Sequence, residues 1–526
     1  MKKLFVLSAV LFCFSCQNRT PQQSDSALEK DTVEVSVVPE KIPQLPDTQF
    51  VSVNGYEYEI KVFDSLHSGE IDTLTSFLEK VDGRLTFRGN AMRNADFGGK
   101  VSGKPDTVVI EWTFTTETDT TNTKYGRWGG GTGWTGQPLY INWPDSMAEK
   151  FKNSNAGLTE NFGKKEIIFG SLASKVYFLN FETGKKSREP IDVNNPIKGT
   201  VSLDPLMNGK LYVGQGVPAR LPYGQITLNL FNQTVKNTKM AEESAWRGWH
   251  ASDSSPVRVG QFVFRPSENG TIYKYWVQDT VEILHSQMKY RKKGSGGPGM
   301  ESSMAVYRNY GYVADNHGNI VCVNLNNLKP VWIYNNFDDS DATPVIEETD
   351  SAVYVYSGCE MDRQGEAGKS HFVKLNALNG EKVWEYSEDA KKYQSGGKHF
   401  DGGYYATALL GTGNCDSLVF VNYVANEDGQ NGYFYAFRKN DGTLKYKTKL
   451  KCYSWSSPVG FLNENNEMFV LTGDTKGYIY LFDGLTGELL FSRLTGINFE
   501  SSPVVVGNCA VIGSRGNTIY KLRVGN

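Results

Sequence analysis

One stretch near the C-terminus determines the fold. It runs from Ser456 to Ser492 and reads SSPVGFLNENNEMFVLTGDTKGYIYLFDGLTGELLFS. Apolar residues alternate with polar ones in four short segments, and glycine-containing turns such as Lys476-Gly477 separate the segments. Apolar residues at every second position turn one face of a strand towards a core. The stretch therefore predicts four antiparallel strands in one sheet.

Copies of this unit recur along the chain. Its opening has eight counterparts, which are Gly136-Gln137-Pro138, Leu203-Asp204-Pro205, Ser255-Pro256, Ser303-Met304, Thr343-Pro344, Thr407-Ala408, Ser457-Pro458 and Ser502-Pro503. Its third segment recurs at 175–180, 319–324, 371–376, 433–438 and 478–483. The openings are roughly 40 to 67 residues apart, which is the spacing of four-stranded propeller blades with variable loops. The repeats predict an all-β, eight-bladed β-propeller over residues 107–526.

The two ends of the repeat region predict how the ring closes. The last copy, from Ser501 to Val524, has three strands and lacks an outer one. The segment 107–114 carries the missing pattern, and its Trp112 corresponds to Trp332 and Trp384 in the outer strands of their own blades. We expect this N-terminal strand to complete the last blade, because closure removes two exposed sheet edges.

The N-terminus resembles a lipoprotein signal peptide. Two lysines precede an apolar run from Leu4 to Phe14, which is too short to span a bilayer but suits a signal peptide. Small Ser15 then precedes Cys16. We therefore expect residues 1–15 to be removed and Cys16 to be lipidated, with an ordinary cleaved signal as the alternative.

Two further segments precede the propeller. Residues 16–49 are rich in Gln, Ser, Asp, Thr and Pro and predict a disordered tether. Residues 50–106 predict an N-terminal strap, with a hairpin at Asn54-Gly55 and a short helix in which Ile71, Leu74 and Leu78 share one face.

Composition narrows the class of partner. The formal net charge is −3 and no long basic run is present, so nucleic acid is not an expected partner. We expect a monomer in the bacterial cell envelope, held at the outer membrane by its lipid alone and facing the periplasm or the cell surface.

The cysteines give no sign of a metal or redox centre. Five follow Cys16, and they are Cys322, Cys359, Cys415, Cys452 and Cys509. None forms a C-x-x-C pair, so the spacing of a zinc site is absent. We expect buried small hydrophobic residues, with one disulfide as the alternative.

The repeats resemble those of the quinoprotein-like family, also called PQQ-like repeat propellers, which carry Ala-x-Asp-x-x-Thr-Gly-x-x-x-Trp. The segment Phe87–Arg93 is similar to one that often precedes the first Trp strand in that family. The resemblance covers about residues 107–524 and implies one of two kinds of protein. One kind is a dehydrogenase with a quinone, an adjacent-cysteine disulfide, a Trp floor, a calcium held by carboxylate and Asn, and an Asp base. The other is a non-catalytic lipoprotein of the BamB type.

This sequence has no adjacent pair of cysteines. That departure argues against the dehydrogenase, because function is carried by site residues and not by the fold. We expect no catalysis and no cofactor, and a module that binds an envelope protein or a glycan. The alternative is an envelope enzyme with its site in the axial funnel, either a quinoprotein dehydrogenase or a polysaccharide-cleaving propeller.

The loops that lead into the blade openings predict the binding face, because propeller geometry gathers them around one channel. Aromatic rings supply contact area there and charges fix the orientation of a ligand. The candidates are Trp128, Trp134, Arg247, Trp249, His250, Glu301, His399, Asp401 and Trp455. In the alternative, the tryptophans wedge between blades and the charges are solvated.

An acidic turn offers a weak candidate for a metal. Asp338, Asp339 and Asp341 could bind calcium through oxygen, but the turn lacks the glycine and the distal Glu of an EF-hand loop. We therefore expect a solvated turn and no metal.

Overall fold

The computed structural model describes residues 55–67, 69–71, 81–95, 98–133, 136–238, 245–279, 281–395, 398–427 and 429–526. The expected signal peptide, Cys16, the tether and the helix expected from Ile71 onwards (72–80) lie outside this part. The chain divides into two compact units, Met1–Asp47 and Thr48–Asn526, and only the second contains described residues.

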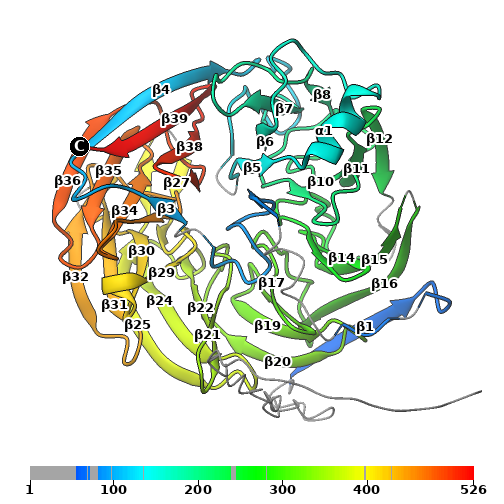
Figure 1. The fold of residues 1–526 in the computed structure, drawn as a ribbon. Helices are drawn as coiled ribbons and strands as arrows, with labels where there is room; N and C mark the ends of the chain where they lie inside the picture. Colours follow the sequence, from blue (N-terminus) through cyan, green and yellow to red (C-terminus); the bar gives the residue numbers. More distant parts are fainter. Residues whose placement is uncertain are drawn as a thin grey trace, which may run out of the picture. The chain divides into compact units, whose positions relative to one another are not determined.

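The second unit is a propeller of eight blades, as predicted (Figure 1). We number the blades in chain order. Blades 1 to 4 consist of the following antiparallel strands: β5 (Leu139–Asn142), β6 (Lys165–Gly170), β7 (Lys175–Asn180) and β8 (Ile191–Asp192); β9 (Ser202–Leu203), β10 (Lys210–Gly214), β11 (Gln225–Asn229) and β12 (Thr234–Thr238); β13 (Val257–Val259), β14 (Phe262–Pro266), β15 (Thr271–Gln278) and β16 (Val281–Lys292); β17 (Ala305–Tyr307), β18 (Tyr310–Ala314), β19 (Asn319–Asn324) and β20 (Pro330–Asn335).

Blades 5 to 8 complete the ring. Their strands are β21 (Val345–Glu348), β22 (Val353–Gly358), β24 (Ala367–Asn376) and β25 (Lys382–Lys391); β29 (Leu409–Leu410), β30 (Leu418–Val424), β31 (Gly432–Arg438) and β32 (Leu444–Lys449); β33 (Val459–Leu462), β34 (Met468–Gly473), β35 (Tyr478–Asp483) and β36 (Leu489–Leu494); β37 (Val504–Val506), β38 (Cys509–Gly513), β39 (Thr518–Gly525) and β4 (Thr107–Thr115).

Short elements decorate the blades. β1 (Tyr56–Val62) adds a fifth, outer strand to blade 3 by pairing with β16, and β2 (Gly83–Arg84) pairs with β5. The others are β3 (Gly99–Lys100), β23 (Glu360–Met361), β26 (Tyr393–Ser395), β27 (Lys398–Phe400), β28 (Gly402–Gly403), helix α1 (Asp145–Lys152) and the 3-10 turn η3 (Gly413–Cys415).

Ring closure follows the sequence prediction. β4 pairs antiparallel with β39, with Phe114 opposite Ile519 and Val109 opposite Arg523. Trp112 also contacts blade 1, since its indole N–H donates to the carbonyl of Phe181 at 2.9 Å. The first and last blades are thus joined by a strand and by a side chain.

The recurring turns that contain glycine explain the aromatic residue in the outer strand of blades 4, 5, 6 and 8. Trp332 of blade 4 donates to the carbonyl of Ala377 at 2.9 Å, and its ring covers Gly380 of blade 5. A Cβ added at Gly380, which has φ +74°, would lie 2.7 Å from that ring. Trp112 and Gly184 form the same contact between blades 8 and 1. The outer aromatic residue and the next blade's glycine therefore form one interlocking contact.

A belt of hydrogen bonds joins the blade openings. In each bond a main-chain N–H donates to the side-chain oxygen at the opening of the next blade: Gln137 to Thr200 (2.7 Å), Ser255 to Ser303 (2.8 Å), Ser303 to Thr343 (2.9 Å), Thr343 to Thr407 (3.2 Å), Thr407 to Ser457 (3.0 Å) and Ser457 to Ser502 (3.0 Å). Ser502 N–H donates to the carbonyl of Gly136 at 2.9 Å. The expected blade 2 opening at Leu203–Pro205 is wrong: Thr200 takes that place, and β9 already ends at Leu203.

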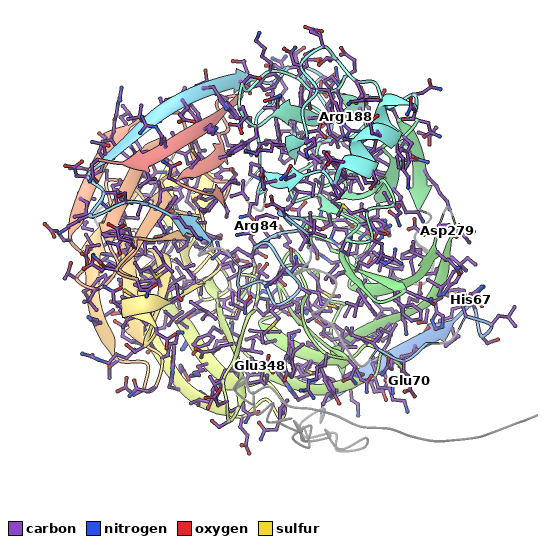
Figure 2. The ribbon with its side chains drawn as sticks, viewed as in Figure 1. His67, Glu70, Arg84, Arg188, Asp279 and Glu348 are labelled. Carbon is purple, nitrogen blue, oxygen red and sulfur yellow. The ribbon has the colours of Figure 1, made fainter. Side chains whose placement is uncertain are left out.

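Residues 84–94, the plug segment, bind to the inner strands of most blades. Figure 2 places Arg84, at its start, near the centre of the ring. Arg88 and Arg93 are 1% and 0% exposed and donate to main-chain carbonyls. The acceptors are Pro458 (2.9 Å) and Ala408 (3.0 Å) for Arg88, and Met304 (2.8 Å) and Ser255 (3.1 Å) for Arg93. The segment therefore ties blades 3, 4, 6 and 7 together.

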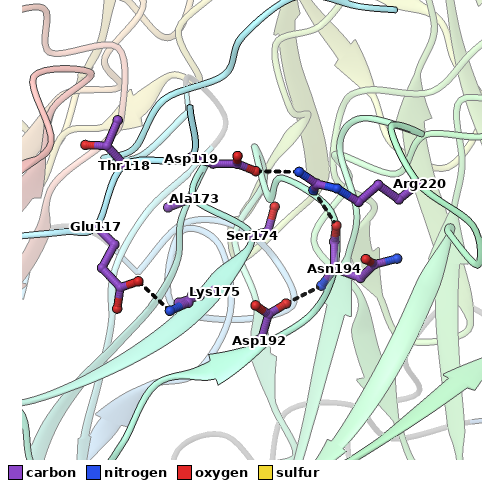
Figure 3. Close-up of a pocket in the computed structure, with 9 residues that line it drawn as sticks. All are labelled: Glu117, Thr118, Asp119, Ala173, Ser174, Lys175, Asp192, Asn194 and Arg220. Atoms are coloured by element: carbon purple, nitrogen blue, oxygen red, sulfur yellow. Dashed lines mark hydrogen bonds and ion pairs between the residues drawn. The ribbon is translucent and has the colours of Figure 1, made fainter. Parts of the chain in front are cut away.

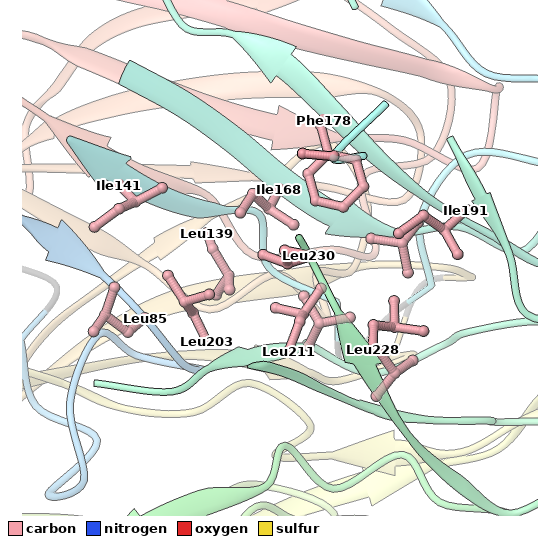
Figure 4. Packing of buried hydrophobic residues seen from close by; sticks show 14 of the residues in the cluster. Leu85, Leu139, Ile141, Ile168, Phe178, Ile191, Leu203, Leu211, Leu228 and Leu230 are labelled. Carbon is pink, nitrogen blue, oxygen red and sulfur yellow. The ribbon is translucent and has the colours of Figure 1, made fainter. Parts of the chain in front are cut away.

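Apolar cores lie between neighbouring blades. Figure 4 shows the one between blades 1 and 2, where Ile141, Ile168 and Phe178 meet Leu211 and Leu228. Similar clusters join blades 3 and 4, 5 and 6, and 7 and 8. All five cysteines of this unit are buried thiols, as expected.

Candidate functional site

The site begins two residues before each belt position. There the chain places Lys198, Asp253, Glu301, Asp341, Tyr405, Trp455 and Glu500, one from each of blades 2 to 8. The residue between each of these and the belt is Gly, Ala or Ser in every blade. We call these seven residues the axial ring; the blade 1 counterpart, Thr135, lies outside the described part. Electrostatic interactions connect Lys198 with Asp253, Glu301 and Glu500, and Asp341 with Glu301 and Tyr405.

Three more carboxylates join the ring on one side. Glu268 lies between β14 and β15, Glu360 begins β23, and Asp339 precedes Asp341. Two groups result, Asp253 with Glu268 and Glu301, and Asp339 with Asp341 and Glu360. Within each group one oxygen of every carboxylate lies within 4.8 Å of the others. We call these six residues the acidic arc.

The first group contains a cation of its own. The Lys198 ammonium forms an ion pair with Asp253 and lies 3.7 Å from Glu301 Oε2. The Trp249 indole N–H donates to Glu268 Oε2 at 2.6 Å, and Arg247 donates to the main-chain oxygen of Glu268 at 2.8 Å. Burial lowers the pKa of Lys198, but the surrounding carboxylates outweigh it and hold that pKa well above its usual value.

The second group has no such partner. Among the described residues, no Lys, Arg or His forms an ion pair with Asp339, Asp341 or Glu360, although the charge of Arg363 acts on Asp339 and opposes the rise of its pKa. One oxygen of each carboxylate is buried without a hydrogen-bond partner there. Burial, together with the charge of Glu301 and its neighbours, raises the pKa of Asp339 to about 8 and raises that of Asp341 and Glu360 well above the usual range.

The other side of the ring is aromatic. The rings of Tyr405 and Trp455 stack with centroids 5.0 Å apart, and Tyr453 lies 5.6 Å from Trp455. Tyr453 also lines an adjoining pocket of about 580 Å³ with Phe400, three lysines and polar side chains. Tyr405 and Trp455 are half-buried, so that part of each ring stays accessible to a ligand.

The predicted site residues divide into two sets. Glu301 and Trp455 belong to the axial ring, Arg247 and Trp249 contact Glu268, and Asp401 pairs with Lys392 (3.0 Å) and acts electrostatically on Tyr405.

Of the remaining predicted residues, His250 and Trp128 do not join the ring. His250 faces Tyr223 at 6.2 Å instead, and within the described chain no hydrogen bond or ring contact links Trp128 to the ring. Trp134 and the side chain of His399 lie outside the described residues.

The expectation of a solvated acidic turn at Asp338–Asp341 is wrong. Asp338 is 1% exposed and accepts from the main chain of Arg363 and from Gln364. Asp341 is 9% exposed. The turn is drawn inward because Glu360 N–H donates to the carbonyl of Asp339 at 2.7 Å.

Sequence reasoning missed Lys198, Asp253, Glu268, Glu360 and Tyr405. For three of them the sequence position could have shown that they belong to the site. Lys198, Asp253 and Tyr405 each stand two residues before the hydroxyl residue of a blade opening. Glu268 and Glu360 carry no comparable signal, because the lengths of the connections that hold them differ between blades.

A second polar pocket on blades 1 and 2 differs in character (Figure 3). Its volume is about 320 Å³, and four of its five charged side chains form two ion pairs, while Asp192 accepts from the main chain of Asn194. Arg220 lies 2.9 Å from Asp119, and Lys175 pairs with Glu117. Since these charges are already neutralised, the pocket is a weaker candidate than the axial ring.

A quinone does not fit these residues. No two cysteines are adjacent in the sequence, and the five described ones are buried in different blades. No chemical step is therefore derived through that group.

Comparison with known proteins bears on the fold. No family model and no curated protein matches the sequence. The structure is similar to quinohemoprotein alcohol dehydrogenase from Comamonas testosteroni, with a TM-score of 0.58 and 12% identity over 86% of this chain and 83% of that one. It is similar to a europium-containing methanol dehydrogenase, with a TM-score of 0.54 and 12% identity over 85% of this chain and 99% of that one.

BamB from Moraxella catarrhalis scores lower, with a TM-score of 0.44 and 13% identity over 70% of this chain and 95% of that one. The likeness to the two dehydrogenases confirms the fold, a propeller of the PQQ-like repeat type. An activity has to come from the site, because one propeller fold serves different functions.

Proposed function

We propose that this chain is a lipid-anchored envelope propeller that binds a glycan at its axial ring without converting it. The stacked pair Tyr405 and Trp455 beside the acidic arc carries the proposal. Sugar rings present apolar faces that pack on aromatic rings, and hydroxyl groups that donate to carboxylates. The ring offers both kinds of group side by side.

The adjoining pocket supports a ligand longer than one sugar. Its volume of about 580 Å³ lies within the range of small-molecule sites. Phe400 and Tyr453 supply aromatic area, while Gln430, Asn431 and Asn498 supply amide groups. A chain of sugars that starts on Trp455 would continue into it.

Polysaccharide cleavage is the second candidate, on one observation. Burial and nearby charge raise the pKa of Asp253 to about 7 and that of Asp339 to about 8. Carboxyl groups that stay protonated near neutral pH are the general acids of glycoside hydrolysis. Release of new reducing ends from envelope polysaccharide would favour this candidate, and binding without release favours the module.

The test compares two tryptophan variants of the lipidated protein. Trp455→Ala should weaken binding to envelope polysaccharide by at least about tenfold, because aromatic anchors carry much of a binding energy. Trp128→Ala, a half-buried tryptophan outside the ring, should leave binding unchanged. Affinity electrophoresis and calorimetry measure both.

Melting temperatures accompany the binding data, to separate lost contacts from misfolding. Equal binding by Trp455→Ala and wild type would contradict the proposal. Capture of a protein from envelope extract, without any polysaccharide binding, would replace the glycan by a protein partner.

A further inference from the structure

The second group of the acidic arc comes from one blade. Asp339 and Asp341 precede β21, and Glu360 follows β22. One oxygen of each lies within 4.8 Å of the other two. Two oxygens on opposite sides of a calcium ion are about 5 Å apart, since each calcium–oxygen distance is about 2.3–2.6 Å. The three carboxylates therefore surround a space of the right size for one cation.

These carboxylates are buried and incompletely partnered. Glu360 is 4% exposed and Asp341 is 9% exposed. Glu360 Oε1, Asp341 Oδ1 and Asp339 Oδ1 are buried and accept no hydrogen bond in the described part of the chain. The side chain of Glu360 interacts with those of Asp341 and Tyr405. A buried polar group without a partner costs free energy, and a buried charge costs more. Either protons held by these carboxyl groups or a bound cation can offset that cost.

The first group of the acidic arc shows how the same fold offsets the cost of buried carboxylates elsewhere. Asp253 and Asp341 occupy equivalent positions, two residues before the belt residues Ser255 and Thr343. Asp253 has the Lys198 ammonium beside it, whereas Asp341 has no cation in an ion pair among the described residues. Within the described chain, an ion-paired lysine thus offsets negative charge in the first group of the acidic arc, and no ion-paired cation does so in the second group.

We propose that Asp339, Asp341 and Glu360 bind one divalent cation of the calcium class. Three carboxylates supply only oxygen ligands, which suit calcium, and they leave coordination positions for water or for hydroxyl groups of a bound ligand. Calcium tolerates such an irregular ligand set, whereas magnesium requires near-octahedral geometry. The proposal concerns the axial site itself and does not depend on a glycan as its ligand.

Calorimetry of the chelator-treated full-length protein tests the site with calcium alone. We expect one saturable calcium per chain and a weaker response to magnesium. Terbium, a calcium substitute, should give luminescence when tryptophan is excited, because Trp455 and Tyr405 lie on the same ring. Calcium should also raise the melting temperature of the wild type.

Glu360→Gln and Asp341→Asn should each weaken calcium binding by at least about tenfold. Asp119→Asn is the matched control, because it removes a carboxylate on the blade 1 side whose partner is Arg220. Without calcium, Glu360→Gln should melt no lower than wild type, since it relieves repulsion, and this excludes a folding defect.

Two results would overturn the cation site. One is the absence of saturable calcium binding by the wild type, and the other is equal binding by Glu360→Gln and Asp119→Asn. The calcium titration does not depend on polysaccharide binding. A failure of the glycan proposal therefore leaves the test of the cation site unchanged.

Discussion

Single buried charges in this propeller are stabilised in different ways. The guanidinium groups of Arg88 and Arg93 each donate to several main-chain carbonyls, which suits a side chain with five donors. Lys274, which is 1% exposed, has one acceptor, the carbonyl of Asn326 at 2.9 Å. Its ammonium also lies 4.0 Å over the ring of Phe262. Burial lowers the pKa of Lys274 to about 8.

Lys274→Met should stabilise the protein at neutral pH. In wild type the unfolded chain holds a proton that the folded chain releases between pH 8 and about 10.4, so stability should rise with pH across that window. Below pH 8 the full penalty of the buried charge is present. At pH 7 the free energy of unfolding of the variant should exceed that of wild type by about 1–3 kcal/mol. Between pH 8 and 9.5 the variant should not show the increase in stability that wild type shows. Urea unfolding at several pH values measures both effects.

Lys150→Met, at an exposed position of α1, is the control and should change neither quantity. A Lys274→Met protein that is less stable than wild type at pH 7 would show that the contacts with Asn326 and Phe262 outweigh the cost of burial.

At the scale of elements, the ring depends on two N-terminal pieces. Deletion of residues 1–49 should leave the melting temperature nearly unchanged, since β1, the plug segment and β4 remain. Deletion of 1–82 also removes β1 and the buried Ile71, and it should lower the melting temperature moderately. Deletion of 1–95 removes the plug segment and leaves buried carbonyls without donors, at about 1–3 kcal/mol each. Deletion of 1–116 also removes β4 and exposes the edge of β39.

Scanning calorimetry should therefore rank the melting temperatures of these variants in that order. Equal values for the 1–49 and 1–116 deletions would contradict the role assigned to β4.

The strands could be predicted because periodic burial leaves a pattern in the sequence. β7, β19 and β35 match the predicted third segments residue by residue. The plug segment left no such pattern, because its arginines bind main-chain carbonyls, which every residue has. The family resemblance marked its residues but not their place in the ring. Likewise the axial ring depends on a position relative to the belt, and the belt becomes visible only when the blades are side by side.

At the scale of the whole molecule, we propose that a lipid on Cys16 attaches the protein to a membrane. No helix in the described residues is long and apolar enough to cross a bilayer. Cys16→Ala should therefore move the protein from the membrane to the soluble fraction, because no other anchor is predicted. Fractionation after a high-salt wash measures this, with Cys322→Ala as the control. A Cys16→Ala protein that stays with the membranes would contradict the lipoprotein assignment.

The long reach of Arg88 sets an order of events during biosynthesis. Its acceptor at Pro458 lies 370 residues further along the chain. A ribosome that adds about 5–20 residues per second makes that acceptor roughly 20–70 seconds after the donor. During that interval Arg88 lacks this acceptor, although the plug segment can already contact β5, Ser255 and Met304. β4 stays without its partner until β39 has been made. The ring therefore closes around Arg88 and β4 only after the last blades emerge.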